Sequence, residues 1–541
     1  MLELKSKKYV RENKISFEKN NIHVTDGDDS EIYKKTFDAP TWIHFGAGNL
    51  FKGFHCAIAQ ELIEQKLSDK GIIVVESFDY EIIEKAYKPY DNLSLQVITC
   101  ANGDMKLRII SSITESIAAN SADKISWKRL KTIFTAPSLQ IVTLSITEKG
   151  YDLKTINGSF KTDILKEFDE GIARPESAMT KLTALMYERY KNNKLPVALV
   201  STDNFSHNGD RLKVAVLTVA NEWKLRKHVN QEFIDYLSDD KKVSFPWSMI
   251  DKITPYPSQK VKQRLDKIGF GSTQIIKTSK NSVIAPFVNT EEAQYLVVED
   301  VFPNGRPALE KAGVYFCDKS TVDKVEKMKV CTCLNPLHSA LAIFGCILGF
   351  TSISDEMKDK DLVKLISKIG YDEGMPVVVD PGIIKPSNFI NEVINVRFPN
   401  PNIPDTPQRI ATDTSQKLGI RFGETIKLYL KRTDLDINSL IFIPLTIAGW
   451  CRYLVARDDN NNPLTLSPDP IMPYLQNFLK DVKIGQPSSS DGKLTTILSN
   501  EKIFSVNLYK ANLGKKIEKY FKEMLAGSGA VRKTLRKYLR S

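Results

Sequence analysis

Residues 43–53 read Ile-His-Phe-Gly-Ala-Gly-Asn-Leu-Phe-Lys-Gly and place a Gly-x-Gly turn between a strand-like and a helix-like segment. A short apolar strand, residues 42–45, runs into Gly-x-Gly, and residues 53–65 then carry apolar side chains at helical spacing. Glycine permits a tight turn and lets the backbone approach a pyrophosphate, while the start of the helix offers free N–H groups. Phe51 stands where the full fingerprint has a third glycine, so a plain strand-to-helix turn is the alternative. The residues predicted to bind a dinucleotide here are Gly46, Gly48, Asn49 and Leu50.

The next strand candidate, residues 72–75, leads into Glu76, and Asp79 lies three residues further on. An acidic side chain near this strand end can accept hydrogen bonds from the adenosine ribose and repel a 2′-phosphate. We therefore expect NAD rather than NADP as the cofactor. For each residue taken singly, an exposed carboxylate in a turn is the alternative.

The first 320 residues alternate between strand-like and helix-like segments, whereas the sequence after Cys317 is mostly helix-like. Repeated β-α-β units imply a parallel, doubly wound sheet. The sequence thus predicts an α/β chain with two domains. Residues 1–318 form a Rossmann-like NAD-binding domain, and residues 319–541 form a mainly helical substrate-binding and catalytic domain. The segments that carry this prediction are strands at 42–45, 72–75, 93–98, 107–113, 141–146 and 196–200, helices at 53–65, 177–192 and 210–223, and later helices at 322–328, 339–350, 361–369, 414–432 and 440–457.

The overall composition is that of a globular protein. The chain has 541 residues, too many for one ordinary core, and is 42% hydrophobic and 26% charged. Its most apolar stretch, residues 340–350, is shorter than the roughly 20 residues that cross a bilayer. The first 21 residues are charged and contain no apolar segment of the kind that directs secretion. We expect a cytoplasmic protein that does not bind membranes.

The formal net charge is +11, from 76 basic and 65 acidic residues. A positive field favours anionic ligands, although a lysine-rich surface gives the same balance. Aromatic residues are not interleaved with the basic ones, so no nucleic-acid partner is expected. We expect a monomer or a small homo-oligomer that acts on a small molecule.

No metal site is expected. The seven cysteines have no regular spacing, and Cys331 and Cys333 are the only close pair. Core cysteines explain such a pair better than a metal site does. The six histidines form no pattern of zinc ligands.

Four further segments carry polar side chains suited to carbonyl chemistry. Two of them follow buried strands, where ligands gather in an open α/β sheet, and this places Thr147 and Glu148 with the cofactor. The segments are Thr-Glu-Lys-Gly-Tyr at 147–151, Ser-Thr-Asp-Asn-Phe-Ser-His-Asn-Gly at 201–209, Phe-Pro-Trp-Ser-Met-Ile-Asp-Lys-Ile-Thr-Pro at 245–255 and Glu-Lys-Met-Lys-Val-Cys-Thr-Cys-Leu-Asn-Pro-Leu-His at 326–338.

Together with residues 46–49, 300–307 and 409–417, these segments resemble the mannitol dehydrogenase family of long-chain polyol dehydrogenases and hexuronate reductases. The resemblance covers nearly the whole chain. Residues 245–255 are similar to the family signature, with Ile250 and Lys252 in place of valine and arginine. The resemblance implies a metal-independent oxidoreductase that passes a hydride between a nicotinamide dinucleotide and a sugar derivative.

The resemblance also implies the catalytic residues. The family's base is a lysine followed by an asparagine and a histidine, which Lys329, Asn335 and His338 match. Glu326 matches the family's glutamate three residues before the lysine, which favours Lys329 over Lys327. The asparagine follows after six residues instead of five, and one residue is about 100° of helix rotation. A local bulge or a non-helical stretch is needed to absorb it.

These residue types suit the reduction of a ketone. An amine is a usable acid or base near neutral pH when desolvation and nearby positive charge lower its pKa, and Arg409 and Lys417 would supply that charge. Asn204 and Asn335 would hold the oxyanion through their amide N–H groups. His338 would orient the substrate, and Glu326 would relay protons from Lys329 to solvent. Taken singly, such residues are more often surface ion pairs, caps or satisfied core groups.

Residues 327–338, 397–402 and 409–415 are most similar to the bacterial fructuronate reductases, also called mannonate oxidoreductases. The expected reaction is the NAD(H)-dependent reduction of D-fructuronate to D-mannonate in hexuronate catabolism. Arg409 would bind the uronate carboxylate in a bidentate manner. The alternatives are a tagaturonate reductase, a mannitol or other polyol 2-dehydrogenase and, in a different class, a non-catalytic NAD-binding sensor.

Overall fold

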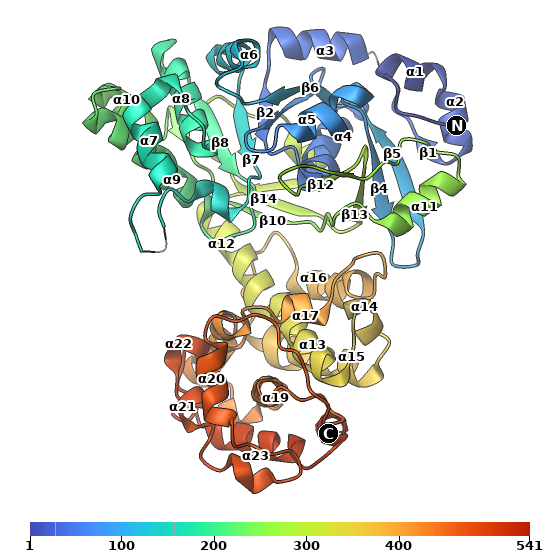
Figure 1. The fold of residues 1–541 in the computed structure, drawn as a ribbon, viewed down its shortest axis with the longest axis vertical. Helices are drawn as coiled ribbons and strands as arrows, with labels where there is room; N and C mark the ends of the chain where they lie inside the picture. The colour runs from blue at the N-terminus through green and yellow to red at the C-terminus, as the bar shows by residue number, and fades with distance from the viewer. Residues whose placement is uncertain (28, 156, 541) are drawn as a thin grey trace. The chain divides into compact units, whose positions relative to one another are not determined.

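The computed structural model describes residues 1–27, 29–155 and 157–540, which form two compact units (Figure 1). Unit 1 contains Met1–Cys100 and Asp104–Asp323, and unit 2 contains Ala101–Gly103 and Lys324–Ser541. The predicted division into domains between residues 318 and 319 stays a prediction.

The core of unit 1 is a six-stranded sheet in which all neighbouring strands are parallel, in the order β6-β3-β2-β7-β8-β9. Numbered along the chain, this is the order 3-2-1-4-5-6 of a dinucleotide-binding fold. The predicted fold class, an α/β Rossmann-like unit followed by a helical unit, is confirmed. The strands are β2 (Trp42–Phe45), β3 (Ile72–Glu76), β6 (Ile113–Ala118), β7 (Ile141–Leu144), β8 (Val197–Ser201) and β9 (Val243–Ser244).

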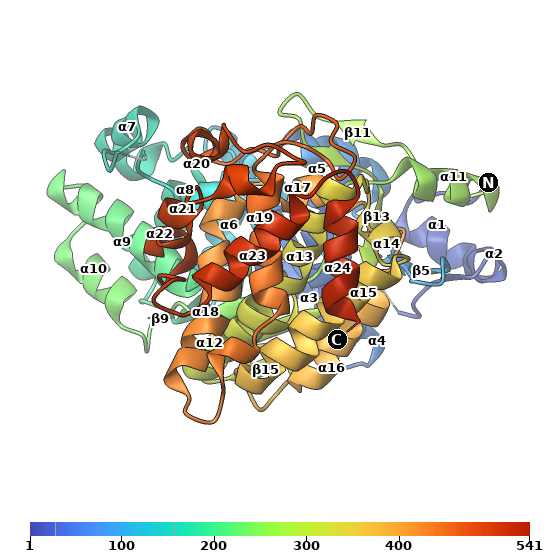
Figure 2. The ribbon, with the colours of Figure 1, turned by 90° about the horizontal axis from the view of Figure 1, so that it is seen from below.

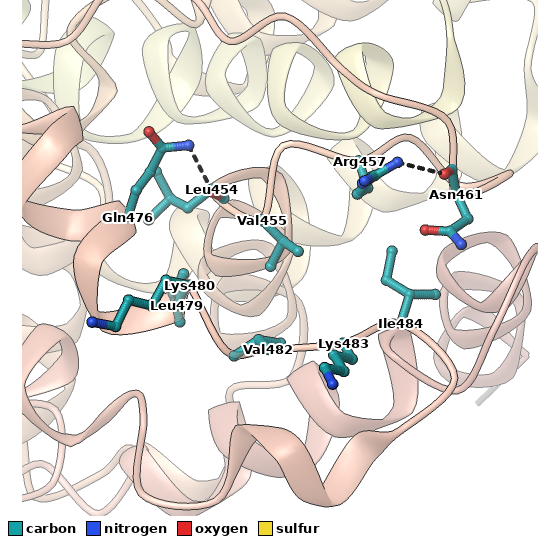
Figure 3. Close-up of a pocket in the computed structure, with 10 residues that line it drawn as sticks. All are labelled: Leu454, Val455, Arg457, Asn461, Gln476, Leu479, Lys480, Val482, Lys483 and Ile484. Atoms are coloured by element: carbon teal, nitrogen blue, oxygen red, sulfur yellow. Dashed lines mark hydrogen bonds between the residues drawn. The ribbon is translucent and has the colours of Figure 1, made fainter.

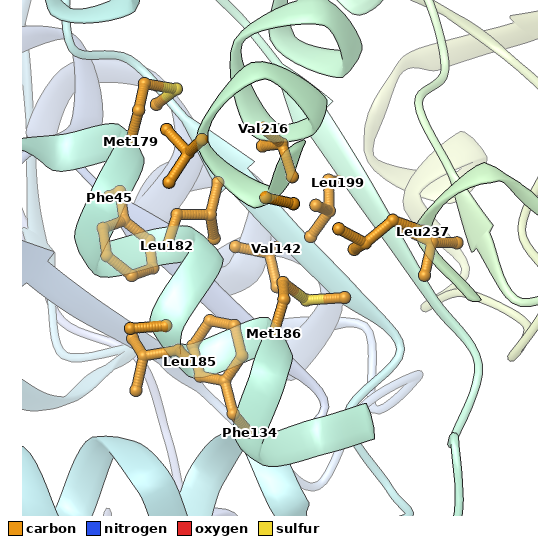
Figure 4. Close-up of a cluster of buried hydrophobic side chains, with 14 of the residues drawn as sticks. Phe45, Phe134, Val142, Met179, Leu182, Leu185, Met186, Leu199, Val216 and Leu237 are labelled. Atoms are coloured by element: carbon orange, nitrogen blue, oxygen red, sulfur yellow. The ribbon is translucent and has the colours of Figure 1, made fainter. Parts of the chain in front are cut away.

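The central strands are apolar throughout because both faces of the sheet are covered. Alternate residues of a strand point to opposite faces. Ile43 and Phe45 therefore belong to one buried cluster, and Trp42 to the other. Figure 4 shows the first cluster, in which Phe45 and Val142 of the sheet meet side chains of the surrounding helices. Helices that follow the strands of this sheet include α4 (Cys56–Glu64), α5 (Glu81–Ala86), α6 (Lys124–Thr135), α7 (Thr162–Glu170), α8 (Ala178–Lys191), α9 (Asn208–Leu225) and α10 (Gln231–Ser238).

Three smaller sheets complete unit 1. A four-stranded sheet has the order β1-β5-β4-β13, a three-stranded sheet the order β10-β14-β15, and β11 pairs with β12. The strands are β1 (Ile22–His23), β4 (Ser94–Thr99), β5 (Met105–Ile110), β10 (Ser248–Asp251), β11 (Ile276–Lys277), β12 (Val283–Ile284), β13 (Phe287–Glu291), β14 (Tyr295–Glu299) and β15 (Val314–Cys317).

The prediction of one strand over residues 107–113 was wrong. The structure has β5 ending at Ile110 and β6 beginning at Ile113 in a different sheet. The backbone N–H groups of Ser111 and Ser112 both donate to Gln60 Oε1, at 2.8 and 2.9 Å. Because both groups bond to a side chain, the ladder of strand hydrogen bonds ends there.

Unit 2 consists of helices and turns packed around two buried helices, α13 and α19. In Figure 2, α19 lies beside α13 and α23, and these pairs are in contact. Every residue of α19 is buried, which explains its nearly continuous apolar sequence. The helices are α13 (Asn335–Leu348), α14 (Ile353–Glu356), α15 (Lys360–Ser367), α16 (Pro386–Glu392), α17 (Pro407–Ile410), α18 (Glu424–Lys431), α19 (Phe442–Tyr453), α20 (Met472–Leu479), α21 (Thr495–Leu498), α22 (Glu501–Phe504), α23 (Gly514–Met524) and α24 (Ala530–Leu539).

The continuous helical run Lys319–Leu348 contains α12 (Lys319–Met328) and α13. By length and hydropathy alone it is able to cross a membrane, but 72% of its most apolar window is buried inside the protein. Burial of this kind is what a core helix requires.

Several helices are interrupted by π turns, in which a backbone N–H bonds to the carbonyl five residues earlier. Uninterrupted helices over residues 53–65, 361–369 and 414–432 were predicted, and these predictions were wrong in detail. Residues 414–432 divide into a 3₁₀ turn, the π turn η11 and α18. The π turns are η1 (Phe51–His55), η6 (Lys329–Cys333), η7 (Lys368–Gly374), η9 (Val393–Arg397) and η11 (Gly419–Gly423).

Candidate active site

Four neighbouring strands of the large sheet, in the order β3-β2-β7-β8, end at the same edge because they are parallel. The predicted residues of unit 1 all follow these ends: the glycine turn after β2, Glu76 and Asp79 at β3, Thr147 and Glu148 after β7, and Asn204 after β8. The chain reverses direction across the sheet between β2 and β7, which is where open α/β sheets bind ligands.

The two glycines of the turn have different surroundings. Gly46 has a φ of +117°, and a Cβ there would lie 2.2 Å from the carbonyl oxygen of Ser145. Its N–H donates to the carbonyl oxygen of Val75 at 2.8 Å. A Cβ on Gly48 would meet no heavy atom within 4 Å. Gly46 is thus required by the packing of the chain itself, whereas Gly48 faces space that a phosphate can enter.

Glu76 braces this turn. Its Oε2 accepts the N–H of Ala47 at 3.0 Å, and its Oε1 accepts those of Phe78 at 2.8 Å and Asp79 at 3.2 Å. The side chain of Asp79 is also buried and accepts the hydroxyl of Thr278 at 2.6 Å. Both carboxylates predicted to face a ribose therefore hold protein groups, while their negative charge stays at the end of β3.

The start of the following helix is anchored by side chains. Asn49 Nδ2 donates to the carbonyl oxygen of Val283 at 3.2 Å, and Leu50 precedes the π turn η1. Lys52, which the sequence reasoning did not single out, is fully buried in η1 and donates to the carbonyl oxygens of Ala86 and Ala285. Burial lowers the pKa of Lys52 to about 7. Lys52 therefore ties this helix to two other segments of unit 1.

Asp203 fixes the segment after β7. Its two carboxylate oxygens accept the N–H groups of Ile146 and Thr147, each at 2.9 Å, and the hydroxyl of Tyr151 at 2.7 Å. These bonds hold Thr147 at a φ of +64°, a region that side chains seldom adopt. Burial raises the pKa of Asp203. The sequence reasoning missed this residue, although it directly precedes Asn204.

Asn204 and Glu148 lie at the surface of unit 1. Asn204 is exposed just beyond β8, and Glu148 forms an ion pair with Arg211. On the same segment as Asn204, the ring of His207 stacks on that of Trp247 at 4.1 Å between centroids.

In unit 2, Lys329 is the first residue of the π turn η6, and its carbonyl oxygen accepts the N–H of Leu334 at 3.1 Å. A π turn holds one residue more than an α turn. The extra residue between Lys329 and Asn335 is therefore absorbed in the turn, and Asn335 begins α13. Lys329 is buried, whereas Lys327 is exposed. Glu326, on α12, is half-buried.

His338 lies on α13, one turn beyond Asn335, and its Nε2 lies 3.0 Å from Asp405 Oδ2. Asp405 Oδ1 accepts Nη2 and Nε of Arg409, at 2.6 and 3.0 Å. Helix α17, which carries Arg409, packs on α13. Burial lowers the pKa of His338, and Asp405 opposes this effect. The structure thus brings His338 and Arg409 together on a carboxylate that the sequence reasoning did not identify.

Two further cations lie near this group. Arg421, in η11, donates to Ser339 Oγ of α13, and burial lowers its pKa to about 10. Lys417 donates to the carbonyl oxygen of Thr412 at 2.5 Å, and burial followed by the charge of Arg421 lowers its pKa. We call His338, Asp405, Arg409, Lys417 and Arg421 the cationic cluster. It offers proton-transfer groups and positive charge to an anionic substrate.

A cavity of about 580 Å³ also lies in unit 2, around the end of α19 and the end of α20 (Figure 3). Its polar side chains are Arg457, Asn461, Gln476, Lys480 and Lys483, and no predicted site residue lines it. Within residues 1–27, 29–155 and 157–540, no group of three or more His, Cys, Asp or Glu side chains is arranged to hold a metal ion.

Comparison with known proteins adds independent information. Residues 40–311 match the family model of the mannitol dehydrogenase Rossmann domain, and residues 321–525 match that of the mannitol dehydrogenase C-terminal domain. The chain is 52% identical over 522 residues to a D-mannonate oxidoreductase of Thermotoga maritima. The aligned region covers 96% of this chain and 96% of that protein.

Two solved structures share the fold. One is a substrate-free D-sorbitol dehydrogenase, with a TM-score of 0.74 and 23% identity, covering 93% of this chain and 97% of the other. The second is a mannitol 2-dehydrogenase of Pseudomonas fluorescens in a ternary complex with NAD and D-mannitol. Its TM-score is 0.67, with 24% identity, over 96% and 97% of the two chains.

Proposed function

Because the chain belongs to the mannitol dehydrogenase family, we propose that it is an NAD-dependent oxidoreductase that reduces D-fructuronate to D-mannonate in hexuronate catabolism. The observation that carries the proposal is the 52% identity, over nearly the full length of both chains, to a D-mannonate oxidoreductase. We extend the proposal to a cytoplasmic enzyme that works on small molecules as a monomer or small homo-oligomer.

The cofactor fits the edge of the large sheet. The open space at Gly48 is the kind of cradle that a pyrophosphate needs, and the helix that follows presents N–H groups. The charges of Glu76 and Asp79 disfavour a 2′-phosphate, which supports NAD over NADP. The residues proposed to line the cofactor site are Gly46, Gly48, Asn49, Leu50, Glu76, Asp79, Thr147 and Glu148.

NADH supplies the hydride when it is bound, and the protein has to supply the proton. We assign this proton to the ammonium group of Lys329, which delivers it to the carbonyl oxygen of the substrate as that oxygen gains negative charge. The amide N–H group of Asn335, at the start of α13, is proposed to stabilise the same oxygen. The role of Asn204 as an oxyanion donor stays a prediction from the family resemblance. Glu326 then returns a proton from solvent to Lys329.

The carboxylate of a uronate is the feature that the cationic cluster suits best. Arg409 has a side chain that is 65% exposed, although Asp405 already holds one edge of its guanidinium group. Lys417 and Arg421 add positive charge nearby, and His338 would bind a substrate hydroxyl. A neutral polyol would leave this charge without a counterpart. A non-catalytic sensor would have no use for a buried Lys329.

The test is NADH oxidation by purified, EDTA-treated protein with D-fructuronate, tagaturonate and fructose supplied separately. We expect turnover of D-fructuronate with kcat/KM at least about 100-fold above that for fructose, equal to about 2.7 kcal/mol. Preferred turnover of tagaturonate or fructose would replace the substrate with that of the corresponding alternative. If the protein bound NADH but turned over none of the three, the proposed activity would be wrong.

A further inference from the structure

Asp405 occupies a fixed position in unit 2. Its backbone N–H donates to the carbonyl oxygen of Ile403 at 2.8 Å, and its own carbonyl oxygen accepts the N–H of Ile353 at 3.0 Å. Thr406, the next residue, caps α17 by accepting the N–H of Arg409. The side chain of Asp405 is 7% exposed. The carboxylate is therefore placed by the framework of α14 and α17 rather than by a free loop.

The two carboxylate oxygens of Asp405 face different partners. Oδ2 lies 3.0 Å from His338 Nε2, and Oδ1 accepts Nη2 and Nε of Arg409 at 2.6 and 3.0 Å. Burial by itself would raise the pKa of Asp405, but these two partners hold that pKa below its usual value. The carboxylate is consequently ionised near neutral pH, and it binds both groups at once.

We propose that Asp405 is a positioning residue that aligns His338 and Arg409 together for an acidic substrate, an inference that rests on the proposed function. Because Nε2 of His338 is in contact with Asp405 Oδ2 at 3.0 Å, the carboxylate favours the proton on Nε2, which leaves Nδ1 as an acceptor for a substrate hydroxyl. The guanidinium group of Arg409 is held by Asp405 through Nε and Nη2. Its Nη1 makes no hydrogen bond within the described ranges and can therefore donate to the substrate carboxylate. The distance between the two substrate contacts is then set by a single carboxylate.

A second carboxyl group nearby does not disturb this arrangement. Glu356 of α14 is fully buried, and neither of its oxygens has a hydrogen-bond partner in the part of the chain that the structure describes. Burial, together with the negative charges of Asp405 and Asp359, raises the pKa of Glu356 to about 9. Glu356 is therefore neutral near pH 7, and Asp405 alone supplies the negative charge that His338 and Arg409 meet.

The competing explanation is an ordinary ion pair between residues four apart in sequence, which contributes little when exposed. Lys368 and Asp372, also in unit 2, form such a pair, with side chains 32% and 50% exposed. Asp405 differs in its burial and in its second partner, His338. Asp372→Asn is therefore the matched control for Asp405→Asn.

The experiment measures kcat and KM for D-fructuronate in the wild type and in Asp405→Asn, Asp405→Glu and Asp372→Asn, with the melting temperature of each. We expect Asp405→Asn to lower kcat/KM about 100-fold, mostly through KM, because both contacts lose their alignment. Asp405→Glu should recover part of the lost kcat/KM. Asp372→Asn, the control, should have the same kcat/KM as the wild type.

A combined variant separates positioning from general damage. If Asp405 acts through His338 and Arg409, then adding Asp405→Asn to the variant that carries both His338→Ala and Arg409→Ala should cause little further loss. The inference would be overturned if the losses in kcat/KM multiplied in the combined variant, or if Asp405→Asn kept a kcat/KM within twofold of the wild type. Should Asp405→Asn not fold, the same cycle with Asp405→Glu decides the matter. A wild type that does not reduce D-fructuronate would instead refute the proposed function.

Discussion

In unit 1, the carboxylates of Glu76 and Asp203 accept hydrogen bonds from backbone N–H groups, whereas in unit 2 the carboxylate of Asp405 contacts the side chains of His338 and Arg409. The glycine turn is thus held through main-chain groups, both its own and those at the ends of neighbouring strands. The cationic cluster depends on side chains from α13, α17 and η11. We infer that the first site is sensitive to backbone substitutions, and the second to the loss of individual charges.

The largest effect is expected at Lys329, and it tests the assignment of the proton donor to unit 2. Lys329→Met should lower kcat by about a thousandfold or more, because the proton donor is removed. NADH binding, followed by fluorescence titration, should stay within about twofold of the wild type, since the cofactor residues are proposed in unit 1. Lys327→Met is the control, because Lys327 is two residues away and exposed. Equal losses in both variants would show that the assignment to Lys329 is wrong.

A matched pair of glycine variants tests the backbone character of the other site. Gly48→Ala should leave the melting temperature unchanged but weaken NADH binding about 100-fold, because the Cβ enters the space proposed for the pyrophosphate. Gly46→Ala should also lower the melting temperature, because its Cβ would lie 2.2 Å from the Ser145 carbonyl oxygen. Calorimetry and NADH titration of both variants distinguish the two effects. If Gly48→Ala bound NADH like the wild type, the cofactor would have to lie elsewhere.

The same contrast explains what the sequence could predict. The Gly46-x-Gly48 turn and the strands around it are local patterns, and the order of the sheet follows from repeated β-α-β units. The π turn at Lys329 could not be predicted, because helical periodicity carries no sign of a single wide turn. Only the extra residue before Asn335 hinted at it. Asp405 was missed because its two partners are four and 67 positions away, and the second is brought to it only by the packing of α17 on α13.

Glu356→Gln should stabilise the protein near pH 7, because unit 2 buries a carboxyl group that has to take up a proton on folding. The pKa of Glu356 is raised to about 9 in the folded state, so an unfolded chain releases this proton at much lower pH. The stability that the group contributes is complete below its unfolded pKa and is lost as pH rises toward 9. At pH 7 the wild type should therefore be less stable than the glutamine variant by about 3 kcal/mol.

The difference between the two proteins should become small near pH 4.5, where Glu356 is protonated in the folded state and in about half of the unfolded chains. Thermal or urea unfolding at pH 4.5, 6 and 7.5 measures it, and Asp372→Asn, at an exposed carboxylate, serves as the control. A gain in stability that is the same at every pH would mean that packing, and not the buried carboxyl group, is responsible.

The smallest effect is expected at Asp79, and it tests whether unit 1 also uses charge. Asp79→Asn removes one negative charge at the end of β3 while its amide oxygen can still accept the hydroxyl of Thr278. We expect the ratio of kcat/KM for NADPH to that for NADH to rise about 10-fold, equal to about 1.4 kcal/mol, because repulsion of the 2′-phosphate is reduced. Glu76→Gln is the informative comparison, since it also weakens the bonds that brace the glycine turn and should impair both cofactors. An unchanged ratio in Asp79→Asn would mean that this carboxylate serves only to hold Thr278, and the preference for NAD would then rest on the shape of the turn.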